Sequence, residues 1–352
     1  MKETAIIYSP RYLDHKARLG DPESPRRLTA IMKGIKQESL LDSEDCSVIE
    51  PRLASVSDLE LVHDSEYITR VNQISKSGGG LLGEYTIASE ESYDVARLAA
   101  GGAMEAVDRV MAGEYRNAFV LARPPGHHAG PRYARGFCIF NNAALAAKHL
   151  IRDFGLQRVV VLDIDAHHGN GTQEIFYATD RVLYISLHED PTEYPETGFP
   201  DETGEGEGRG YTVNIPLPFG TGDRAYWKAV KTILTPIVRQ YNPQFMLVSA
   251  GFDSYYRDMI GELSLSAHIF LPVFRTILDL AQRICEDRIV AVLEGGYRLR
   301  FLRKTVPAVI GRMAGLNIRI REPHPFLNLA AERAAEKTLE YVRRVQSRFW
   351  AL

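Results

Sequence analysis

The sequence has few cysteines and no long apolar run. Its three cysteines, Cys46, Cys138 and Cys285, are far apart and form no CxxC pair. A disulfide framework is therefore not expected, and this usage is typical of a reducing compartment. No stretch approaches the roughly 20 apolar residues that a membrane-spanning helix needs. Charges also interrupt the apolar start of the chain too soon for a secretory signal. We expect a cytoplasmic protein without a membrane partner.

The sequence also lacks an excess of charge of either sign. Its 42 Lys and Arg residues nearly balance 45 Asp and Glu residues, which leaves a formal net charge of -3. This balance gives no reason to expect a nucleic-acid partner. Hydrophobic residues make up 45% of the 352 residues, enough for a large core, and neither a linker nor a repeat divides them. We predict one domain over residues 1–352.

Short β-branched runs alternate with longer helical patterns along the chain. Most of these runs are apolar throughout, as in strands buried on both faces of a parallel sheet. Alternating strands and helices predict a single α/β domain with a mostly parallel central sheet. The predicted strands are Thr4–Ser9, Asn117–Ala122, Arg158–Asp165, Arg181–Leu187, Tyr211–Leu217, Phe245–Gly251 and Ile289–Gly296. Helices are predicted over Asn141–Phe154, Asp223–Tyr241 and Ser266–Glu286.

The last part of the chain has the pattern of an amphipathic helix. Apolar residues recur at helical spacing between about residue 325 and residue 349. We predict a terminal helix that packs on the domain. Its outer face is compatible with a contact between copies of the chain, so a homo-oligomer stays open.

Polar residues collect directly after four of the predicted strands. Ligands of open parallel sheets bind beyond the carboxyl ends of the strands, so these residues predict one shared site. "RPPGHHAG" follows one strand, "DIDAHHGNG" another, and "AGFDS" and "EGGY" follow two more. The candidate residues in these motifs are His127, His128, Asp163, Asp165, His167, Asn170, Asp253 and Tyr297.

Three of the candidates have the chemistry of a metal site. Asp165 and His167 are two residues apart, so they point the same way in extended chain. With Asp253 they offer two oxygen ligands and one nitrogen ligand, which leaves a position open as in catalytic zinc sites. A divalent cation would also compensate the cost of burying two carboxylates. The alternative, that these side chains only cap backbone groups at strand ends, is weaker for the whole set than for Asp253 alone.

The remaining candidates suit proton transfer and oxyanion binding. His127 and His128 titrate near neutral pH, as a general acid and base must. Asp163 is expected to orient one imidazole and Asn170 the other without added charge, which separates their pKa values. The hydroxyl of Tyr297 is placed to stabilise a developing oxyanion, a role worth about 3 kcal/mol. A polar turn at the histidines and a core position for the tyrosine are the structural alternatives.

Taken together, the motifs resemble the zinc-dependent deacetylase family, which includes histone deacetylases, acetylpolyamine amidohydrolases and their bacterial and archaeal relatives. The matching segments are "RPPGHHA", "GFCIFNNAALAA", "LDIDAHHGNGTQEIFY", "LVSAGFDS" and "LEGGY", in family order. The resemblance implies the arginase/deacetylase fold, with about eight parallel strands flanked by helices. It also implies hydrolysis of an N-acetyl or other acyl amide by metal-activated water. Asn170, rather than Asp, is closer to the class II branch.

The resemblance assigns a role to each matching residue. It implies that Asp165, His167 and Asp253 bind zinc, that His127 and His128 are the acid–base pair, and that Tyr297 polarises the acyl carbonyl. It places Phe137 and Ile260 in the substrate tunnel, with a further wall between Tyr194 and Gly198, and Arg27 at an internal exit cavity. A structural potassium ion is implied at Asp163, Asp165, His167, Ser186 and Leu187.

The substrate is less clearly implied. The family's substrate-clamping aspartate has no clear counterpart, since its place falls near Tyr85 beside Glu84. Polyamine-selective relatives carry an acidic gatekeeper where this chain has Ile260, although Glu262 is close by. These departures argue against strict polyamine specificity, and acetyl-lysine, an acetylpolyamine and a small acetylated metabolite all stay open as substrates.

Two further functions are considered. A binuclear arginase-like hydrolase would need bridging carboxylates, but Tyr255 lies where a second acid past Asp253 is expected. A non-catalytic acyl-lysine binding module would have lost a metal ligand, a histidine of the pair or the tyrosine. All six residues are present, which favours the deacetylase.

Overall fold

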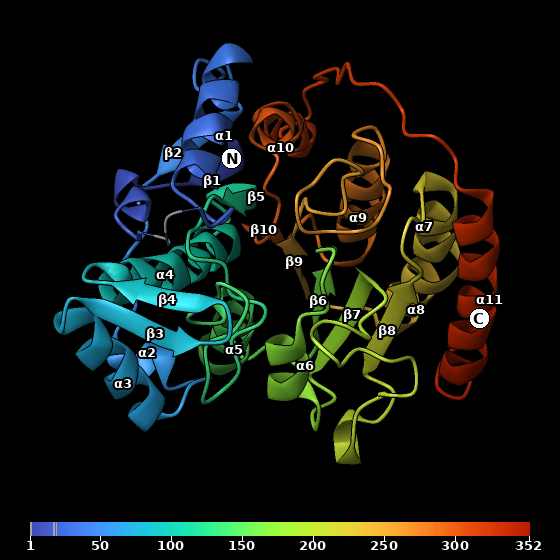
Figure 1. Cartoon of the computed structure of the whole chain (residues 1–352), viewed down its shortest axis with the longest axis horizontal. Coiled ribbons are helices and arrows are strands. Elements are labelled where there is room, and N and C mark those ends of the chain that lie inside the picture. Colours follow the sequence, from blue (N-terminus) through green and yellow to red (C-terminus); the bar gives the residue numbers. More distant parts are fainter. Residues whose placement is uncertain (1, 17, 19) are drawn as a thin grey trace.

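The computed structural model describes residues 2–16, 18 and 20–352. Its centre is an eight-stranded sheet in which every pair of neighbouring strands is parallel (Figure 1). The strand order is β2-β1-β5-β10-β9-β6-β7-β8. The strands are β1 (Lys2–Ile7), β2 (Cys46–Ile49), β5 (Tyr115–Val120), β6 (Val159–Asp163), β7 (Val182–Glu189), β8 (Thr212–Leu217), β9 (Phe245–Ala250) and β10 (Ile289–Leu293). The predicted α/β fold with a parallel sheet is confirmed.

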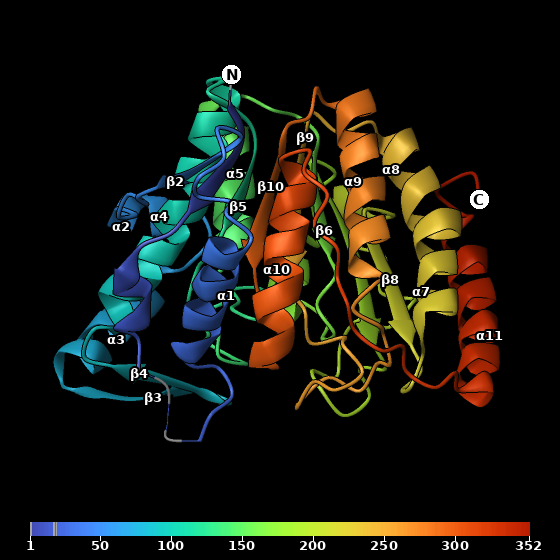
Figure 2. The same ribbon diagram turned by 90° about the horizontal axis from the view of Figure 1, so that it is seen from above.

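Helices cover both faces of this sheet. Figure 2 shows one row of helices running along a single face. That row consists of α1 (Arg26–Gln37), α10 (Leu299–Met313), α9 (Phe270–Ile284), α7 (Asp223–Ala229) and α8 (Thr235–Tyr241). The opposite face is covered by α4 (Ser92–Met111), α5 (Asn142–Asp153) and α6 (Asn170–Phe176). Both faces are therefore dry, which explains why the strand sequences are apolar throughout.

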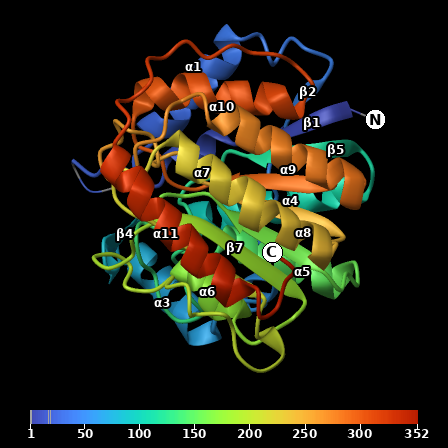
Figure 3. The same ribbon diagram turned by 90° about the vertical axis from the view of Figure 1, so that its right-hand side faces the viewer.

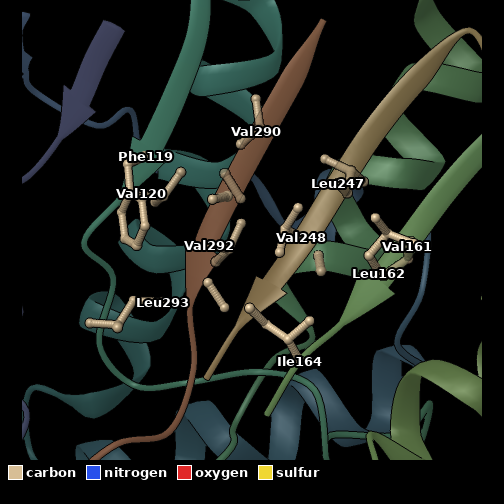
Figure 4. Close-up of a cluster of buried hydrophobic side chains, with 14 of the residues drawn as sticks. Phe119, Val120, Val161, Leu162, Ile164, Leu247, Val248, Val290, Val292 and Leu293 are labelled. Atoms are coloured by element: carbon tan, nitrogen blue, oxygen red, sulfur yellow. The ribbon is translucent and has the colours of Figure 1, made fainter. Parts of the chain in front are cut away.

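The central strands are packed into one hydrophobic core. Every residue of β6, β9 and β10 is buried. Figure 4 shows Val161, Leu247, Val248 and Val292 side by side on neighbouring strands. Burying one such side chain contributes roughly 1.5–3 kcal/mol to the free energy of folding. The tight packing of these side chains also holds the strand ends rigidly in place.

All seven predicted strands are present with small shifts at their ends, and an eighth was missed. That strand, β2, has four residues, and only Cys46 is buried, so it carries little apolar signal. A separate hairpin of β3 (Gly79–Gly83) and β4 (Thr86–Ser89) was also missed, because its glycines are typical of loops. It packs against α3 (Ser65–Lys76), whereas α2 (Val56–Leu59) packs against α5.

The predicted helix Asp223–Tyr241 is interrupted by a π-helical turn. This turn, Val230–Leu234, separates α7 from α8. Pro236 follows it and has no N–H to donate to the carbonyl four residues earlier, so the regular hydrogen-bond ladder cannot continue there. The remaining short helices are 3-10 turns at Pro10–Leu13 and Gly206–Gly208.

The predicted terminal helix is α11 (Leu329–Gln346), which packs against β8 and α7 at the edge of the domain (Figure 3). The side chain of Glu332 accepts a hydrogen bond from Gly222 N–H at 3.0 Å, and Trp350 Nε1 donates to the Gly210 carbonyl at 2.9 Å. Within the described ranges, none of the helices has the length and apolar character needed to cross a bilayer.

Candidate active site

The carboxyl ends of the central strands meet at one edge of the sheet. Asp163, the last residue of β6, lies in register with Ser186 of β7 and Ser249 of β9. The loops that follow these strands open into a pocket of about 410 Å³. The predicted residues that line this pocket are His127, His128, Phe137, Asp165, His167, Ile260 and Tyr297.

The three predicted metal ligands converge at the base of this pocket. Each of Asp165, His167 and Asp253 has a ligand atom within 4.8 Å of the others, and all three side chains are buried. His167 Nδ1 lies 3.3 Å from Asp165 Oδ1 and 3.2 Å from Asp253 Oδ2. Two carboxylates and one imidazole nitrogen therefore face one point, as in a three-ligand zinc site.

Glycines leave the room in which the two carboxylates meet. A Cβ on Gly295 would lie 2.2 Å from Asp253 Oδ2 and 2.6 Å from Asp165 Oδ2. Gly295 N–H also donates to Asp165 Oδ2 at 2.7 Å. Burial and the neighbouring Asp165 carboxylate raise the pKa of Asp253. A divalent cation would remove this repulsion, so the residues present fit a metal ion.

The two histidines of the predicted pair differ in their partners. Their rings lie 4.0 Å apart. His127 Nδ1 lies 3.1 Å from Asp163 Oδ2, whose carboxylate also accepts the Tyr184 hydroxyl proton. Burial opposes protonation of His127, but the carboxylates of Asp165 and Asp163 outweigh it and raise its pKa to about 10. These two carboxylates therefore favour the charged form of His127.

His128 has a neutral partner instead. Its Nδ1 lies 2.7 Å from Asn170 Oδ1, and the Asn170 amide donates to the Tyr133 hydroxyl. Burial and the imidazoles of His127 and His167 lower the pKa of His128 well below its usual range. The separation of the two histidine pKa values, which the sequence predicts, is present in the structure.

Tyr297 lines the same pocket as the two histidines. Its ring contacts that of Phe137, with centroids 5.8 Å apart. Burial raises the pKa of Tyr297 well above its usual value, even though the Arg27 guanidinium lowers it, so the hydroxyl keeps its proton. Arg27 is fully buried behind this ring and donates to the carbonyls of Gly296 and Glu294. Its assignment to an exit cavity stays a prediction.

Aromatic and apolar side chains form the upper walls. Phe137 adopts a φ of +68°, which turns its ring into the pocket. The ring of Tyr194 lies 5.2 Å from that of His128 and 5.9 Å from that of His167. The predicted wall after residue 193 is thus formed by Tyr194, and Ile260 lines the pocket as well.

The pocket mouth is acidic. Four exposed or partly exposed carboxylates line it, and no Lys or Arg is among the described lining residues: Glu84, Asp190, Glu193 and Glu262. Arg135 neutralises Glu84 at 2.8 Å. In the described part of the chain, no Lys or Arg lies within ion-pair distance of Asp190, Glu193 or Glu262. The free end of a substrate would meet a negative potential there.

The five residues of the predicted potassium site lie on β6 and β7 and in the loop after β6. Asp163 pairs with Ser186 in the parallel register, and Leu187 follows on β7. All five residues are buried. Oxygen ligands are therefore concentrated here, as an alkali cation requires, and the potassium ion stays a prediction.

Several residues of the site were missed by sequence reasoning. Glu294 accepts hydrogen bonds from Gly126 N–H and His127 N–H at 2.7 and 3.2 Å, which holds the histidine loop against β10. Asp258, Tyr133, Tyr184 and Glu189 were missed too. Glu294 and Glu189 each lie at a strand end, a position that could have singled them out, whereas Tyr184 is hidden inside an apolar strand.

Comparisons with known proteins agree with this geometry. The family model of the histone deacetylase domain matches residues 21–313. A probable deacetylase of Archaeoglobus fulgidus is 42% identical over 99% of this chain and 98% of its own length. The histone deacetylase-like amidohydrolase of Pseudomonas aeruginosa is 38% identical over 92% of this chain and 84% of its own. The crystal structure of the HDA15 HD domain superposes with a TM-score of 0.89 at 35% identity, covering 99% of this chain and 95% of that one.

Proposed function

The chain belongs to the histone deacetylase family, and from this premise we propose that it is a zinc-dependent amidohydrolase that removes acetyl groups from cationic N-acetylated amines. The observation that carries the proposal is the convergence of three metal ligands, a histidine pair and a tyrosine hydroxyl in one pocket. A binding module would not need this set, and a second metal would need bridging carboxylates where Tyr255 stacks on Phe301 instead.

Asp165, His167 and Asp253 would hold the zinc ion. When bound, zinc supplies Lewis-acid polarisation of the acyl carbonyl and lowers the pKa of a water molecule towards 7. The pocket walls formed by Phe137 and Tyr194 orient the acyl amide above these ligands and exclude bulk water. This confinement strengthens every electrostatic interaction at the reacting carbonyl.

The histidine pair handles the protons. His128 Nδ1 is hydrogen-bonded to the neutral amide of Asn170, so His128 is available as the base that accepts a proton from the attacking water. His127 rests on the Asp163 carboxylate, which keeps a positive charge beside the reacting centre. The proton is then delivered to the amine nitrogen, so the carbon–nitrogen bond breaks with acetate and a free amine as products. The Tyr297 hydroxyl donates to the carbonyl oxygen as its negative charge grows.

The acidic mouth selects a cationic leaving group. Asp190, Glu193 and Glu262 face the entrance, and no Lys or Arg among the described residues lies within ion-pair distance of them. An acetylated diamine or polyamine carries its remaining ammonium groups beyond the acetyl amide, where these carboxylates lie. A neutral amide of the same length would lack this attraction. Acetyl-lysine within a basic peptide would also be attracted by these carboxylates, but its positive charges lie on other residues of the peptide.

Three further features complete the proposal. A structural potassium ion would lie among the oxygen donors between β6 and β7, and would stiffen the strand end that carries Asp165. Arg27 would bind acetate leaving behind Tyr297. The three cysteines are buried and unpaired, which favours a reducing cytoplasmic location.

The test is acetate release by the zinc-loaded protein, with and without a chelator. N-Acetylputrescine and N-butylacetamide form a matched pair, because both have a four-carbon chain and only the first carries an ammonium group. We expect chelator-sensitive turnover, with a higher kcat/KM for the cationic member. The kcat/KM advantage of N-acetylputrescine should shrink in E193Q, which removes one of the carboxylate charges. It should also shrink at high salt, which screens surface charges. Equal turnover of the pair would contradict the cationic substrate, and no acetate release from any acetylated amine would contradict the hydrolase.

A further inference from the structure

Glu189 is an acidic residue inside the pocket whose carboxylate the proposed reaction does not use. It is the last residue of β7, and its side chain is buried. Its backbone N–H donates to the carbonyl of Ala166 at 2.7 Å, next to His167 in the chain. This hydrogen bond fixes the end of β7 against the loop that carries two of the metal ligands.

The two oxygens of Glu189 have separate partners. Oε1 lies 3.5 Å from His167 Nε2, and Oε2 accepts a hydrogen bond from Glu262 N–H at 2.6 Å. Across the described ranges, His167 is the one basic side chain within ion-pair distance of Glu189. The Glu262 N–H therefore holds one oxygen of the Glu189 carboxylate in place, and the other oxygen faces Nε2 of the His167 ring.

The two nitrogens of His167 thus face opposite partners. Nδ1 faces Asp165 and Asp253, and Nε2 faces Glu189. We infer that Glu189 is a positioning residue for the metal site: its carboxylate faces the Nε2–H of His167 and so keeps the Nδ1 lone pair directed at the ion. An imidazole whose outer N–H meets a carboxylate is fixed in orientation and is a more basic ligand. The inference rests on the zinc site of the proposed function.

The experiment compares zinc affinities, measured without substrate by competition with a chromogenic chelator. E189A removes the acceptor, E189Q keeps an acceptor without the charge, and E193Q neutralises a mouth carboxylate that does not contact His167. Loss of such a partner typically weakens metal binding by about 10–100-fold. We expect about 100-fold weaker binding in E189A, about tenfold in E189Q and no change in E193Q. The absorption spectrum of the Co²⁺-loaded E189A protein should shift as well, because a merely structural role would leave the ligand field unchanged.

Zinc binding within about twofold of the native value in folded E189A or E189Q would overturn the inference. Equal weakening in E193Q and E189Q would overturn it too, because the cause would then be the charge of the mouth. If E189A does not fold, E189Q alone decides between these outcomes. Failure of the native protein to bind zinc is a separate result, which would overturn the proposed function and this inference with it.

Discussion

The carboxylate of Asp258 accepts a hydrogen bond from the backbone N–H of Tyr297 at 2.7 Å. The same carboxylate accepts from Ile260 N–H at 3.2 Å through its other oxygen. One partly buried side chain therefore joins the loop that carries the oxyanion donor to the loop that forms part of the tunnel wall. Neither loop has regular secondary structure at these positions, so Asp258 determines their relative placement.

We expect Asp258→Ala to lower kcat by about a hundredfold, because a displacement of about 1 Å in a catalytic group has an effect of that size. Zinc affinity should stay unchanged, since the hydrogen bonds to the Asp258 carboxylate come from backbone N–H groups and not from the three ligands. Steady-state kinetics and chelator competition measure the two quantities. Asp279→Ala, at an exposed position on α9, is the control. A loss of zinc binding in Asp258→Ala would show that the residue supports the metal site instead.

Replacing Tyr297 by Phe removes the hydroxyl and keeps the ring against Phe137. Removal of one oxyanion donor typically lowers kcat by about 100–1,000-fold, and we expect a loss in this range. Thermal stability and zinc stoichiometry should match those of the native protein. Full activity of this variant would show that Tyr297 is only a wall of the pocket.

Gly295→Ala is expected to abolish metal binding without unfolding the protein. The added methyl group would lie within 2.2 Å of Asp253 Oδ2 and 2.6 Å of Asp165 Oδ2, so one carboxylate must turn away. Equilibrium dialysis with zinc measures the loss, and circular dichroism checks the fold. Gly222→Ala is the matched control, because its nearest contact is the flexible end of the Glu332 side chain at 3.1 Å. Stoichiometric zinc in Gly295→Ala would mean that the ligands do not meet where this glycine leaves space.

The sequence predicts the sheet and the main residues of the site for the same physical reason. Strands buried on both faces are apolar throughout, so an acid or histidine at the end of such a run stands out. Asp165, Asp253 and the histidine loop were found in this way, and the family resemblance assigned their roles. The short edge strand β2 and the glycine-rich hairpin were missed because neither buries enough apolar surface to show a pattern.

The supporting residues were harder to predict because their partners are distant in sequence. Asp258 acts on the backbone of Tyr297, 39 residues later, and that contact depends on the path of two irregular loops. Glu189 reaches His167 only because β7 lies beside β6 in parallel register. The identity of a single residue does not indicate which backbone N–H group or which neighbouring strand it will contact. These contacts therefore follow only from the folded structure.

His63 predicts a loss of stability in mild acid. Its ring is buried, with Nδ1 3.0 Å from the Gly130 carbonyl and Nε2 accepting from Asn141 N–H at 2.9 Å. Both bonds together require a neutral imidazole. Burial lowers the pKa of His63 from 6.5 to about 4. The unfolded chain therefore takes up this proton first, and stability falls as the pH drops from about 6.5 towards 4.

At pH 5 the shift corresponds to about 2 kcal/mol of lost stability relative to pH 7.5. Urea unfolding of the EDTA-treated protein at both pH values measures this loss, and removing metal beforehand excludes a contribution from zinc that dissociates as the pH falls. In His63→Gln, whose side chain does not titrate, the loss should be smaller by about this amount. His15, whose pKa burial also lowers to about 4, remains in both proteins and cancels in the comparison. If the two proteins lost the same stability between pH 7.5 and 5, His63 would not be held neutral, and its bond to Asn141 N–H would have to be reassigned.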